Sequence, residues 1–278
     1  MEQAWEKYQR VKDMLARLDQ VAIAFSGGVD SSLLLYAAVQ ALGPERVLAV
    51  TSASETYPER ERLAAEQVAR EIGAPQLVIH TEELAIPGYA ENPINRCYFC
   101  KQELFTQLVA VAQERGIRHV AFGAIADDEG EFRPGLMAAR EKNVLAPLQQ
   151  AQLIKREVRF LAHALGLSNW DKPSLACLSS RIPYGHRITR EILSQVDQAE
   201  LFLLQLGFRQ VRVRHHGDVA RIEVPPEDRV GILDLTALIT EKFLALGYHH
   251  IALDLNGYRS GSMNAGLPLV VTGANGQL

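Results

Sequence analysis

The feature that most constrains this chain is a short apolar run that ends in a glycine-rich loop. Residues 21–25 are uninterrupted apolar residues, and the next seven are Ser26, Gly27, Gly28, Val29, Asp30, Ser31 and Ser32. An apolar run bounded by glycine is typical of a strand that is buried on both faces of a parallel sheet. Residues 31–42 are small and apolar and end at a Gly-Pro pair, which predicts a helix. We therefore expect a strand, a tight loop and a helix in direct succession.

The composition of this loop suits the binding of a phosphate group. Glycines bring backbone N–H groups close to an anion, and the helix that follows adds N–H donors and a favourable dipole. Ser31 and Ser32 can donate to phosphate oxygens, and Asp30 can hold a magnesium ion that bridges them. The alternative is a strand–helix turn in which serine or aspartate only caps the helix. The whole string favours nucleotide binding, and it is not a Walker A loop because no lysine precedes the serine pair.

Strand and helix patterns then alternate along the first part of the chain. Apolar residues at helical spacing predict helices over 2–18, 58–72, 98–116 and 153–165. Short apolar runs predict further strands over 46–51, 76–80 and 119–122. This alternation predicts a doubly wound α/β domain built on a parallel sheet.

The pattern changes near residue 190 and predicts a second, smaller domain. After a helix over 192–206, two alternating runs flank a Gly-Asp turn at 211–215 and 220–224, which predicts a hairpin with one polar and one apolar face. A helix near 227–246 and a strand near 251–255 complete an α+β unit. We therefore expect three parts, an α/β domain over 1–186, an α+β domain over 187–264 and a tail over 265–278.

The overall composition excludes several classes of protein. The chain is 47% hydrophobic and 22% charged with a net charge of −4, which is typical of a globular protein and argues against one built mainly to hold nucleic acid. It has no apolar stretch long enough to span a membrane, and its N-terminus is charged, so we expect a cytoplasmic protein without membrane contact. In that compartment three cysteines are not expected to form a disulfide framework.

The three cysteines have the surroundings of reactive or metal-binding thiols. Cys97 and Cys100 form a C-x-x-C pair at the start of a predicted helix, and Cys177 lies in a loop-like stretch between Lys172 and Arg181. Helix N-termini and nearby cations lower the pKa of a thiol and favour the thiolate. The alternative for Cys177 is a small, buried apolar side chain.

The motifs resemble those of a known family. Residues 26–32 resemble the PP-loop of ATP pyrophosphatases, and 122–128, which include Gly123, resemble their second motif. Over about 10–264 the chain also resembles the LarE family, the pyridinium-3,5-biscarboxylic acid mononucleotide sulfurtransferases of nickel-pincer cofactor biosynthesis. The segments that carry this likeness are 129–135, 172–185, 211–214 and 254–261.

The resemblance implies a two-step reaction. ATP with Mg²⁺ adenylates a substrate carboxylate in a phosphate site that includes Ser26–Ser32 and Gly123, and sulfur then displaces AMP to give a thiocarboxylate. Asp30 and Cys177 are the implied catalytic residues. Because this chain has all of Cys97, Cys100 and Cys177, the resemblance favours a 4Fe–4S cluster held by three thiolates. The alternatives are Cys177 alone as a sacrificial sulfur donor, a redox dithiol, or a zinc site completed by His80 or His186.

A pair of arginines marks the second candidate site. Arg212 and Arg214 alternate with valines, so both guanidinium groups are expected on one face of a strand, where they suit an anion. They could equally pair with Glu223 on the neighbouring run. The resemblance favours binding of the substrate phosphate by this domain, with Arg259 and Glu200 as further contacts, although Glu200 could be only an exposed helix residue. It also implies a homo-oligomer, such as a hexamer, to which the same domain could contribute.

Other functions are compatible with parts of the pattern. A PP-loop tRNA thiolase would share the adenylation and the cysteine chemistry, but the acidic net charge and the lack of an added RNA-binding module count against it. An amidating ligase, such as a synthetase for NAD or GMP, would leave the cysteines without a role. A nucleotide-sensing module would bind ATP without forming AMP.

Overall fold

The computed structural model describes residues 1–128, 134–174, 176–259 and 261–264, and these divide into two compact units. The first unit comprises Met1–Ser179 and Tyr184–Leu193, and the second comprises Ser180–Pro183 and the chain from Ser194 onward. The boundary that the sequence placed after residue 186 therefore falls within a segment of the first unit. Residues 129–133 and the tail over 265–278 lie outside the described residues.

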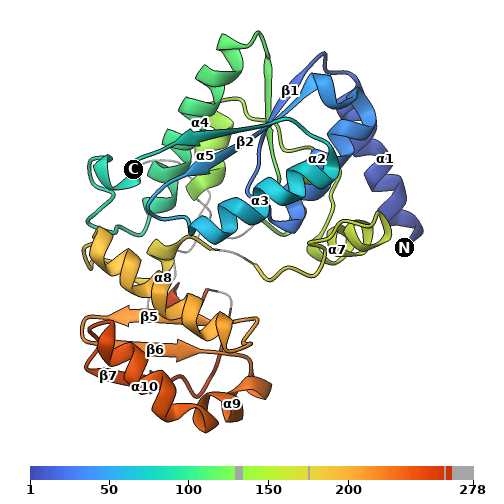
Figure 1. Ribbon diagram of the computed structural model, residues 1–278. Coiled ribbons are helices and arrows are strands. Elements are labelled where there is room, and N and C mark those ends of the chain that lie inside the picture. The colour runs from blue at the N-terminus through green and yellow to red at the C-terminus, as the bar shows by residue number, and fades with distance from the viewer. Residues whose placement is uncertain (129–133, 175, 260, 265–278) are drawn as a thin grey trace, which may run out of the picture. The chain divides into compact units, whose positions relative to one another are not determined.

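The first unit is built on a four-stranded parallel sheet of order β3-β2-β1-β4 (Figure 1). The apolar run that precedes the predicted loop forms β1, which is an inner strand of the sheet. The strands are β1 Val21–Ala24, β2 Val47–Ala53, β3 Gln76–His80 and β4 His119–Phe122. Their parallel pairing and the helices between them confirm the predicted α/β class.

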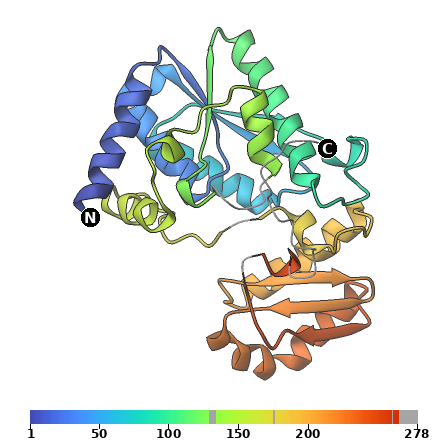
Figure 2. The same cartoon turned by 180° about the vertical axis from the view of Figure 1, so that it is seen from behind.

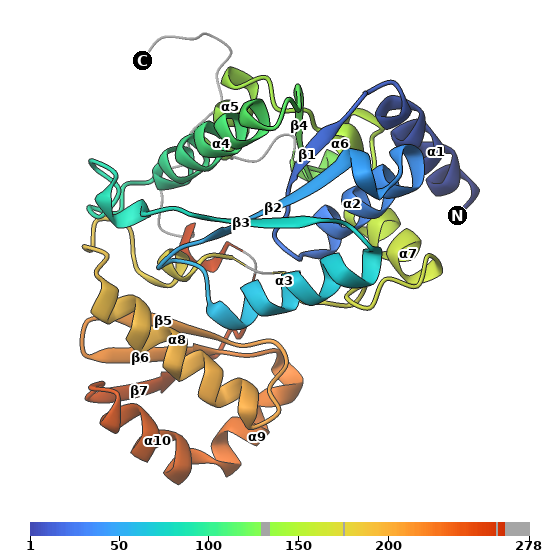
Figure 3. The ribbon, with the colours of Figure 1, turned by 45° about the horizontal axis from the view of Figure 1, so that its top comes forward.

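Helices cover both faces of this sheet, and Figure 3 shows α4 and α5 on the face opposite α3. Ile23 of β1 packs in a core with α1, α2, α3 and α7, whereas its neighbour Ala22 packs in a second core with α4 and α5. Adjacent residues of β1 thus serve opposite layers, as a doubly wound fold requires. The helices are α1 Glu2–Ala16, α2 Val29–Leu42, α3 Glu59–Ile72, α4 Arg96–Glu114, α5 Pro134–Glu141, α6 Pro147–Gln150 and α7 Lys155–Ala164.

The second unit has a three-stranded mixed sheet of order β5-β6-β7. Its strands are β5 Arg212–His216, β6 Val219–Glu223 and β7 His250–Leu253, with β5 and β6 antiparallel and β7 parallel to β6. The helices are α8 Arg190–Gln205, α9 Arg229–Asp234 and α10 Thr236–Ala245. Figures 1 and 2 show α8 and α10 on one face of the sheet, where Val213 and Ile222 pack against Leu203 and Phe243. The predicted hairpin is therefore present.

Three helical features differ from the sequence-based expectation. The helices α5 and α6, of eight and four residues, were not predicted, although proline marks the start of both. The single helix expected over 227–246 is broken at Leu235 into α9 and α10. The hydroxyl of Thr236 donates to the Leu233 carbonyl at 2.6 Å, a local bond that competes with a continuous helix. Across the described ranges, no helix is long and apolar enough to cross a membrane.

Candidate active site

Two glycines, one in the phosphate loop and one after β4, are required by close packing. Gly27 has a φ of +63°, and a Cβ there would lie 2.6 Å from the Cβ of Ala65 on α3. A Cβ at Gly123, just after β4, would lie 2.8 Å from the backbone nitrogen of Ser31. Gly28 differs, because its φ is −80° and a Cβ there would meet only the Ser26 hydroxyl at 3.4 Å. The loop is thus pressed between α3 and the end of β4.

Side chains from distant parts of the first unit hold the carbonyls of this loop. The Tyr57 hydroxyl donates to the Ser26 carbonyl at 2.6 Å. The Gly27 carbonyl accepts from the Asn169 amide at 3.0 Å and from the Lys172 ammonium at 3.2 Å. The first N–H groups of α2 have no acceptor within their own helix and are the natural donors for an anion. The loop therefore has the form of a backbone anion site with braced carbonyls.

The serines of the loop also take part in this bracing. Ser31 donates to the Gly28 carbonyl at 3.0 Å, and its hydroxyl lies 3.2 Å from that of the exposed Ser26. Ser32 is fully buried and accepts from the Asn169 amide at 2.8 Å. The contacts that the sequence predicts between these hydroxyls and a phosphate stay predictions.

Asp30 is paired with a lysine that sequence reasoning did not identify. The Nζ of Lys155, at the start of α7, lies 2.8 Å from both carboxylate oxygens of Asp30. The backbone N–H of Lys155 donates to Asp127 at 2.6 Å, which places the end of β4 and the start of α7 together. Burial raises the pKa of the Asp30 carboxyl, with Lys155 opposing and Asp128 adding to the rise. Asp30 and Asp128 are thus neighbouring carboxylates beside the phosphate loop, and Mg²⁺ prefers such oxygen ligands.

The three cysteines all belong to the first unit. Cys97 is exposed and Cys100 half-buried in the first turns of α4, and Cys177 is half-buried in the segment that follows Lys172. The segment of Cys177 is fixed on its C-terminal side, because the Leu178 N–H donates to the Thr56 carbonyl at 2.9 Å. The buried hydroxyls of Tyr89 and Ser179 also meet at 2.8 Å.

The surroundings of Cys100 disfavour ionisation of its thiol. Burial raises the pKa of the Cys100 thiol, and the charges of Glu83, Cys177 and Cys97 raise it further. The Sγ of Cys100 lies 4.0 Å from the carboxylate of the buried Glu83. The expectation of a lowered thiol pKa is therefore wrong for Cys100, since burial and a carboxylate outweigh the helix terminus.

The cations expected beside Cys177 are engaged elsewhere. Lys172 binds the Gly27 carbonyl and pairs with Glu61 at 2.8 Å, and Arg181 belongs to the second unit. His80 and His186, the alternatives for a zinc ligand, are exposed. Among the described residues, no group of three or more His, Cys, Asp or Glu side chains is arranged to hold a metal ion.

The second unit carries an arginine cluster, which we define as Arg181, Arg212, Arg214 and Arg221. Strand pairing places Arg212 opposite Glu223 and Arg214 opposite Arg221, on the face of the sheet away from the Val213–Ile222 core. Arg212 and Arg214 are both buried. Arg214 donates to Glu223 at 2.7 Å, so the pairing that the sequence offered as an alternative does occur. Arg212 lies over the ring of Tyr258 at 5.4 Å.

Glu200 organises one edge of this cluster. It is 2% exposed and accepts two bonds from Arg181, at 2.8 and 2.9 Å, and one from the backbone N–H of Val213 at 3.0 Å. Burial opposes its ionisation, but Arg181 outweighs burial and lowers the pKa of Glu200. The suggestion that Glu200 is an exposed helix residue is therefore wrong. Arg259 is exposed, and its charge acts on Asp254.

The guanidinium groups of the arginine cluster repel one another. Burial lowers the pKa of the Arg212 guanidinium, and the nearby charges of Arg181 and Arg214 lower it further, while Glu200 opposes them. An anion placed beside Arg212 would relieve this repulsion, and guanidinium groups bind phosphate well.

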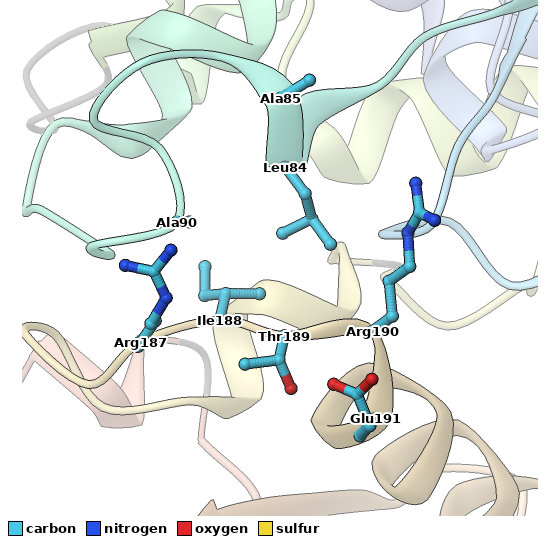
Figure 4. Close-up of a pocket in the computed structure, with 8 residues that line it drawn as sticks. All are labelled: Leu84, Ala85, Ala90, Arg187, Ile188, Thr189, Arg190 and Glu191. Atoms are coloured by element: carbon cyan, nitrogen blue, oxygen red, sulfur yellow. The ribbon is translucent and has the colours of Figure 1, made fainter.

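A separate surface cavity of about 360 Å³ lies at the start of α8 (Figure 4). Arg187 pairs with Glu91 at 3.0 Å, and Arg190 with Glu55 at 2.9 Å. The cavity is lined by Leu84, Ala85, Ala90, Arg187, Ile188, Thr189, Arg190 and Glu191, none of which is a predicted site residue.

Comparison with known proteins identifies the family. Residues 7–92 match the family model for NAD synthase. The chain is 39% identical over 251 residues to the pyridinium-3,5-bisthiocarboxylic acid mononucleotide synthase of Lactiplantibacillus plantarum, which covers 90% of this chain and 91% of the relative. The chain belongs to the LarE family. It is also 41% identical over 260 residues to an uncharacterized protein of Synechocystis sp., covering 93% of this chain and 97% of that protein.

A more distant likeness covers a smaller share of the chain. The chain is 29% identical over 192 residues to the NH(3)-dependent NAD(+) synthetase of Hyperthermus butylicus, with 67% of each chain covered. The LarE match covers most of the chain, including both structural units. As a LarE-family member the chain is an adenylating sulfurtransferase, and its phosphate loop lies within the residues that match the NAD synthase model.

Proposed function

We propose that this protein uses Mg·ATP to adenylate a carboxylate of pyridinium-3,5-biscarboxylic acid mononucleotide and converts it to a thiocarboxylate, in nickel-pincer cofactor biosynthesis. The observation that carries the proposal is that one LarE-family chain contains two different groups of residues suited to anions. A braced phosphate loop lies in the first unit and a buried arginine cluster in the second. An enzyme that joins ATP chemistry to a phosphorylated substrate needs both.

The phosphate loop supplies the adenylation step. The N–H groups at the start of α2 bind the ATP phosphates. Asp30, whose carboxylate pairs with Lys155, would hold the magnesium ion, which would offset the charge of those phosphates. A carboxylate oxygen of the substrate forms a bond to the α-phosphorus, and the bond to pyrophosphate breaks. The Lys155 ammonium, 2.8 Å from Asp30, adds a further positive charge beside the loop.

The arginine cluster holds the phosphate of the mononucleotide. Arg212 and Arg214 are the direct ligands, and Arg259 reaches the same phosphate from the segment after β7. Glu200 fixes Arg181 next to Arg212 and thereby maintains the positive charge of the site. This assignment makes the second unit the substrate-binding domain.

Sulfur then replaces the AMP group. A sulfur nucleophile forms a bond to the activated carbonyl carbon, and the carbonyl–oxygen bond to AMP breaks, which leaves a thiocarboxylate. We infer that Cys97, Cys100 and Cys177 hold a 4Fe–4S cluster, which would supply a replaceable sulfide. In support, all three thiols lie in one unit, and the charges of Cys177 and Cys97 both act on Cys100. A cluster binds each thiolate through a different iron and therefore does not require the close ligand spacing of a single ion.

The activity is tested with Mg·ATP, the mononucleotide and a sulfide source under anaerobic conditions. We expect AMP and pyrophosphate only when the mononucleotide is present, and a product in which oxygen has been replaced by sulfur. The same mixture with unmodified tRNA in place of the mononucleotide tests the tRNA thiolase alternative. AMP formation with tRNA but not with the mononucleotide would refute the proposal.

The sulfur source is tested by measuring the iron content, the number of turnovers with added sulfide, and the mass of the polypeptide. A cluster requires about four irons per chain in protein purified without oxygen, several turnovers when sulfide is supplied, and an unchanged polypeptide mass. If reconstituted protein holds no iron and Cys177 loses the mass of hydrogen sulfide after one turnover, Cys177 is instead a sacrificial donor.

We also infer that the protein forms a homo-oligomer through its second unit. Val230 and Leu233 on α9 are 65% and 60% exposed, and Leu238 on α10 is 45% exposed. Light scattering of the full chain tests this inference. Replacing Val230 and Leu233 by serine should lower the measured mass, and a wild-type protein of monomer mass would contradict it.

A further inference from the structure

The ring of Tyr258 contacts one member of the arginine cluster. The Cζ of Arg212 lies over this ring, 5.4 Å from its centroid. This separation is within the range of about 6 Å over which an aromatic face attracts a cation. Arg212 is 8% exposed, and the attraction is stronger where the cation has lost contact with water. The contact is therefore a substantial interaction for this guanidinium group.

The ring differs in kind from the groups that hold the other arginines. Arg181 donates to the carboxylate of Glu200 at 2.8 and 2.9 Å, and Arg214 likewise donates to a buried carboxylate. Each of these partners brings a negative charge next to the guanidinium group. An aromatic ring attracts the cation through its π face and adds no net charge. Tyr258 therefore holds Arg212 without cancelling the positive charge that a phosphate requires.

The backbone of Tyr258 is attached to the sheet beside Arg212. Its N–H donates to the Val224 carbonyl at 2.9 Å. Val224 directly follows β6, whose last residue, Glu223, pairs with Arg212 across the hairpin. The ring thus extends from a point next to the cross-strand partner of the arginine that it contacts.

The turn that leads to this ring is closely packed. The carboxylate of Asp254 accepts from the Asn256 N–H at 2.8 Å, and the Asp254 carbonyl accepts from the Gly257 N–H at 3.0 Å. Gly257 has a φ of +68°, and a Cβ there would lie 2.5 Å from the Val224 carbonyl oxygen. The turn is therefore pressed against the end of β6, and its packing fixes the origin of the ring.

We propose that Tyr258 is a positioning residue for the substrate phosphate, and that its ring holds the Arg212 guanidinium in the orientation that binds the mononucleotide. The inference rests on the mononucleotide site proposed above. Arg181 and Arg214 repel the guanidinium of Arg212, and the attraction of the ring opposes this displacement. Without the ring, the phosphate would have to immobilise a side chain that is no longer held, and this ordering lowers affinity.

Calorimetric titration of the full chain with the mononucleotide and, separately, with Mg·ATP tests the proposal. Tyr258→Leu removes the π face and should weaken mononucleotide binding by about three- to tenfold. Tyr258→Phe keeps the ring and should bind within about twofold of the wild type. Leu255→Ala is the matched control, because it changes an 84% exposed side chain of the same turn and should leave the affinity unchanged. None of these variants should alter the affinity for Mg·ATP.

A double-mutant cycle separates positioning from direct contact with the substrate. In the Arg212→Ala background, Tyr258→Leu should cause no further loss, because the ring acts only through that guanidinium group. Trifluorophenylalanine at position 258 keeps the shape of the ring and weakens its π face. It should lower the affinity for the mononucleotide when Arg212 is present and leave it unchanged in Arg212→Ala. A ring that only filled space would show neither dependence.

The possible failures are distinguishable. If Arg212→Ala weakens mononucleotide binding and Tyr258→Leu does not, the positioning role is wrong and the phosphate site stands. Equal losses from Tyr258→Leu with and without Arg212 would also overturn it, since the ring would then act on the substrate directly. If Arg212→Ala binds the mononucleotide as well as the wild type, the proposed substrate site is wrong and this inference fails with it. Urea unfolding checks each variant, and if Tyr258→Leu does not fold, the fluorinated ring decides the question.

Discussion

The phosphate loop and the arginine cluster are both anion sites, but they are built in opposite ways. The loop presents backbone N–H groups, and its only ion pair is Asp30 with Lys155 among the contacts described above. The arginine cluster presents side chains, and its buried guanidinium groups are held by buried carboxylates, such as Arg181 by Glu200. The first site depends on local backbone geometry, whereas the second depends on charge pairs between residues far apart in sequence.

This difference predicts where substitutions act. A substitution in the phosphate loop should alter ligand binding and chemistry more than folding. The reason is that the loop holds few buried charges that are paired with one another. A change in the arginine cluster also alters folding, because removing one partner leaves the other charge buried. Substitutions at the two sites should therefore differ in their effects on stability and on activity.

The largest effect on stability is expected for Glu200→Ala. It leaves Arg181, which is 1% exposed, without its bidentate partner, and breaking a buried pair in this way costs about 3–5 kcal/mol. Urea unfolding of the full chain measures the loss. The double variant Glu200→Ala with Arg181→Met is the control, since removing both charges should restore much of the stability.

The same pair predicts a pH dependence. Burial opposes the ionisation of Glu200, but Arg181 lowers its pKa overall, so the pair stabilises the fold above the ordinary glutamate pKa of 4.5. This contribution is lost as the pH falls below that value toward the lowered pKa. The stability difference between the wild type and Glu200→Gln should therefore shrink in acid, and a constant difference would contradict the assignment.

Asp30→Asn should separate chemistry from stability in the loop. Loss of a metal ligand is expected to raise the barrier by several kcal/mol, which slows AMP formation by about two to three orders of magnitude. Burial raises the pKa of the Asp30 carboxyl, so ionising it costs stability at neutral pH. The variant should therefore unfold at the same or a higher urea concentration than the wild type. A clear loss of stability would show that the Asp30–Lys155 pair supports the fold.

The two loop glycines form a matched pair. Gly27→Ala places a Cβ at a positive φ and 2.6 Å from Ala65, and the left-handed backbone alone costs about 1–2 kcal/mol. Gly28→Ala meets only the Ser26 hydroxyl at 3.4 Å and should change stability by less than about 1 kcal/mol. Thermal unfolding of both variants measures the stability that each one loses. Equal losses of stability would mean that packing against α3 is not the reason why position 27 requires glycine.

Sequence reasoning succeeded where the structure depends on local patterns. The strands over 76–80 and 119–122 were predicted with the observed bounds. The glycines of the loop lie between a strand and a helix as expected, although the helix begins at Val29, two residues earlier than predicted. Short apolar runs and glycine positions carry that information directly. The PP-loop and LarE motifs were readable for the same reason, because each is a contiguous string.

The parts that sequence reasoning missed depend on tertiary contacts. Tyr57, Lys155 and Asn169 reach the phosphate loop from segments far along the chain, and nothing in their local sequence indicates a partner there. Glu200 was left open as an exposed residue, because its helix shows no sign that Arg181 would be buried against it. The raised pKa of Cys100 likewise follows from burial beside Glu83, which neither segment reveals alone.

The central claim is that ATP and the mononucleotide bind at different sites, and separate titrations of Arg212→Ala test it most directly. Arg212 is buried in the second unit, and loss of a charge-assisted contact to phosphate costs about 1.5–3 kcal/mol, or about one to two decades of affinity. Calorimetric titration should show this loss for the mononucleotide and an unchanged affinity for Mg·ATP, with Arg212→Lys intermediate. An equal loss for both ligands, or a loss confined to Mg·ATP, would contradict the account.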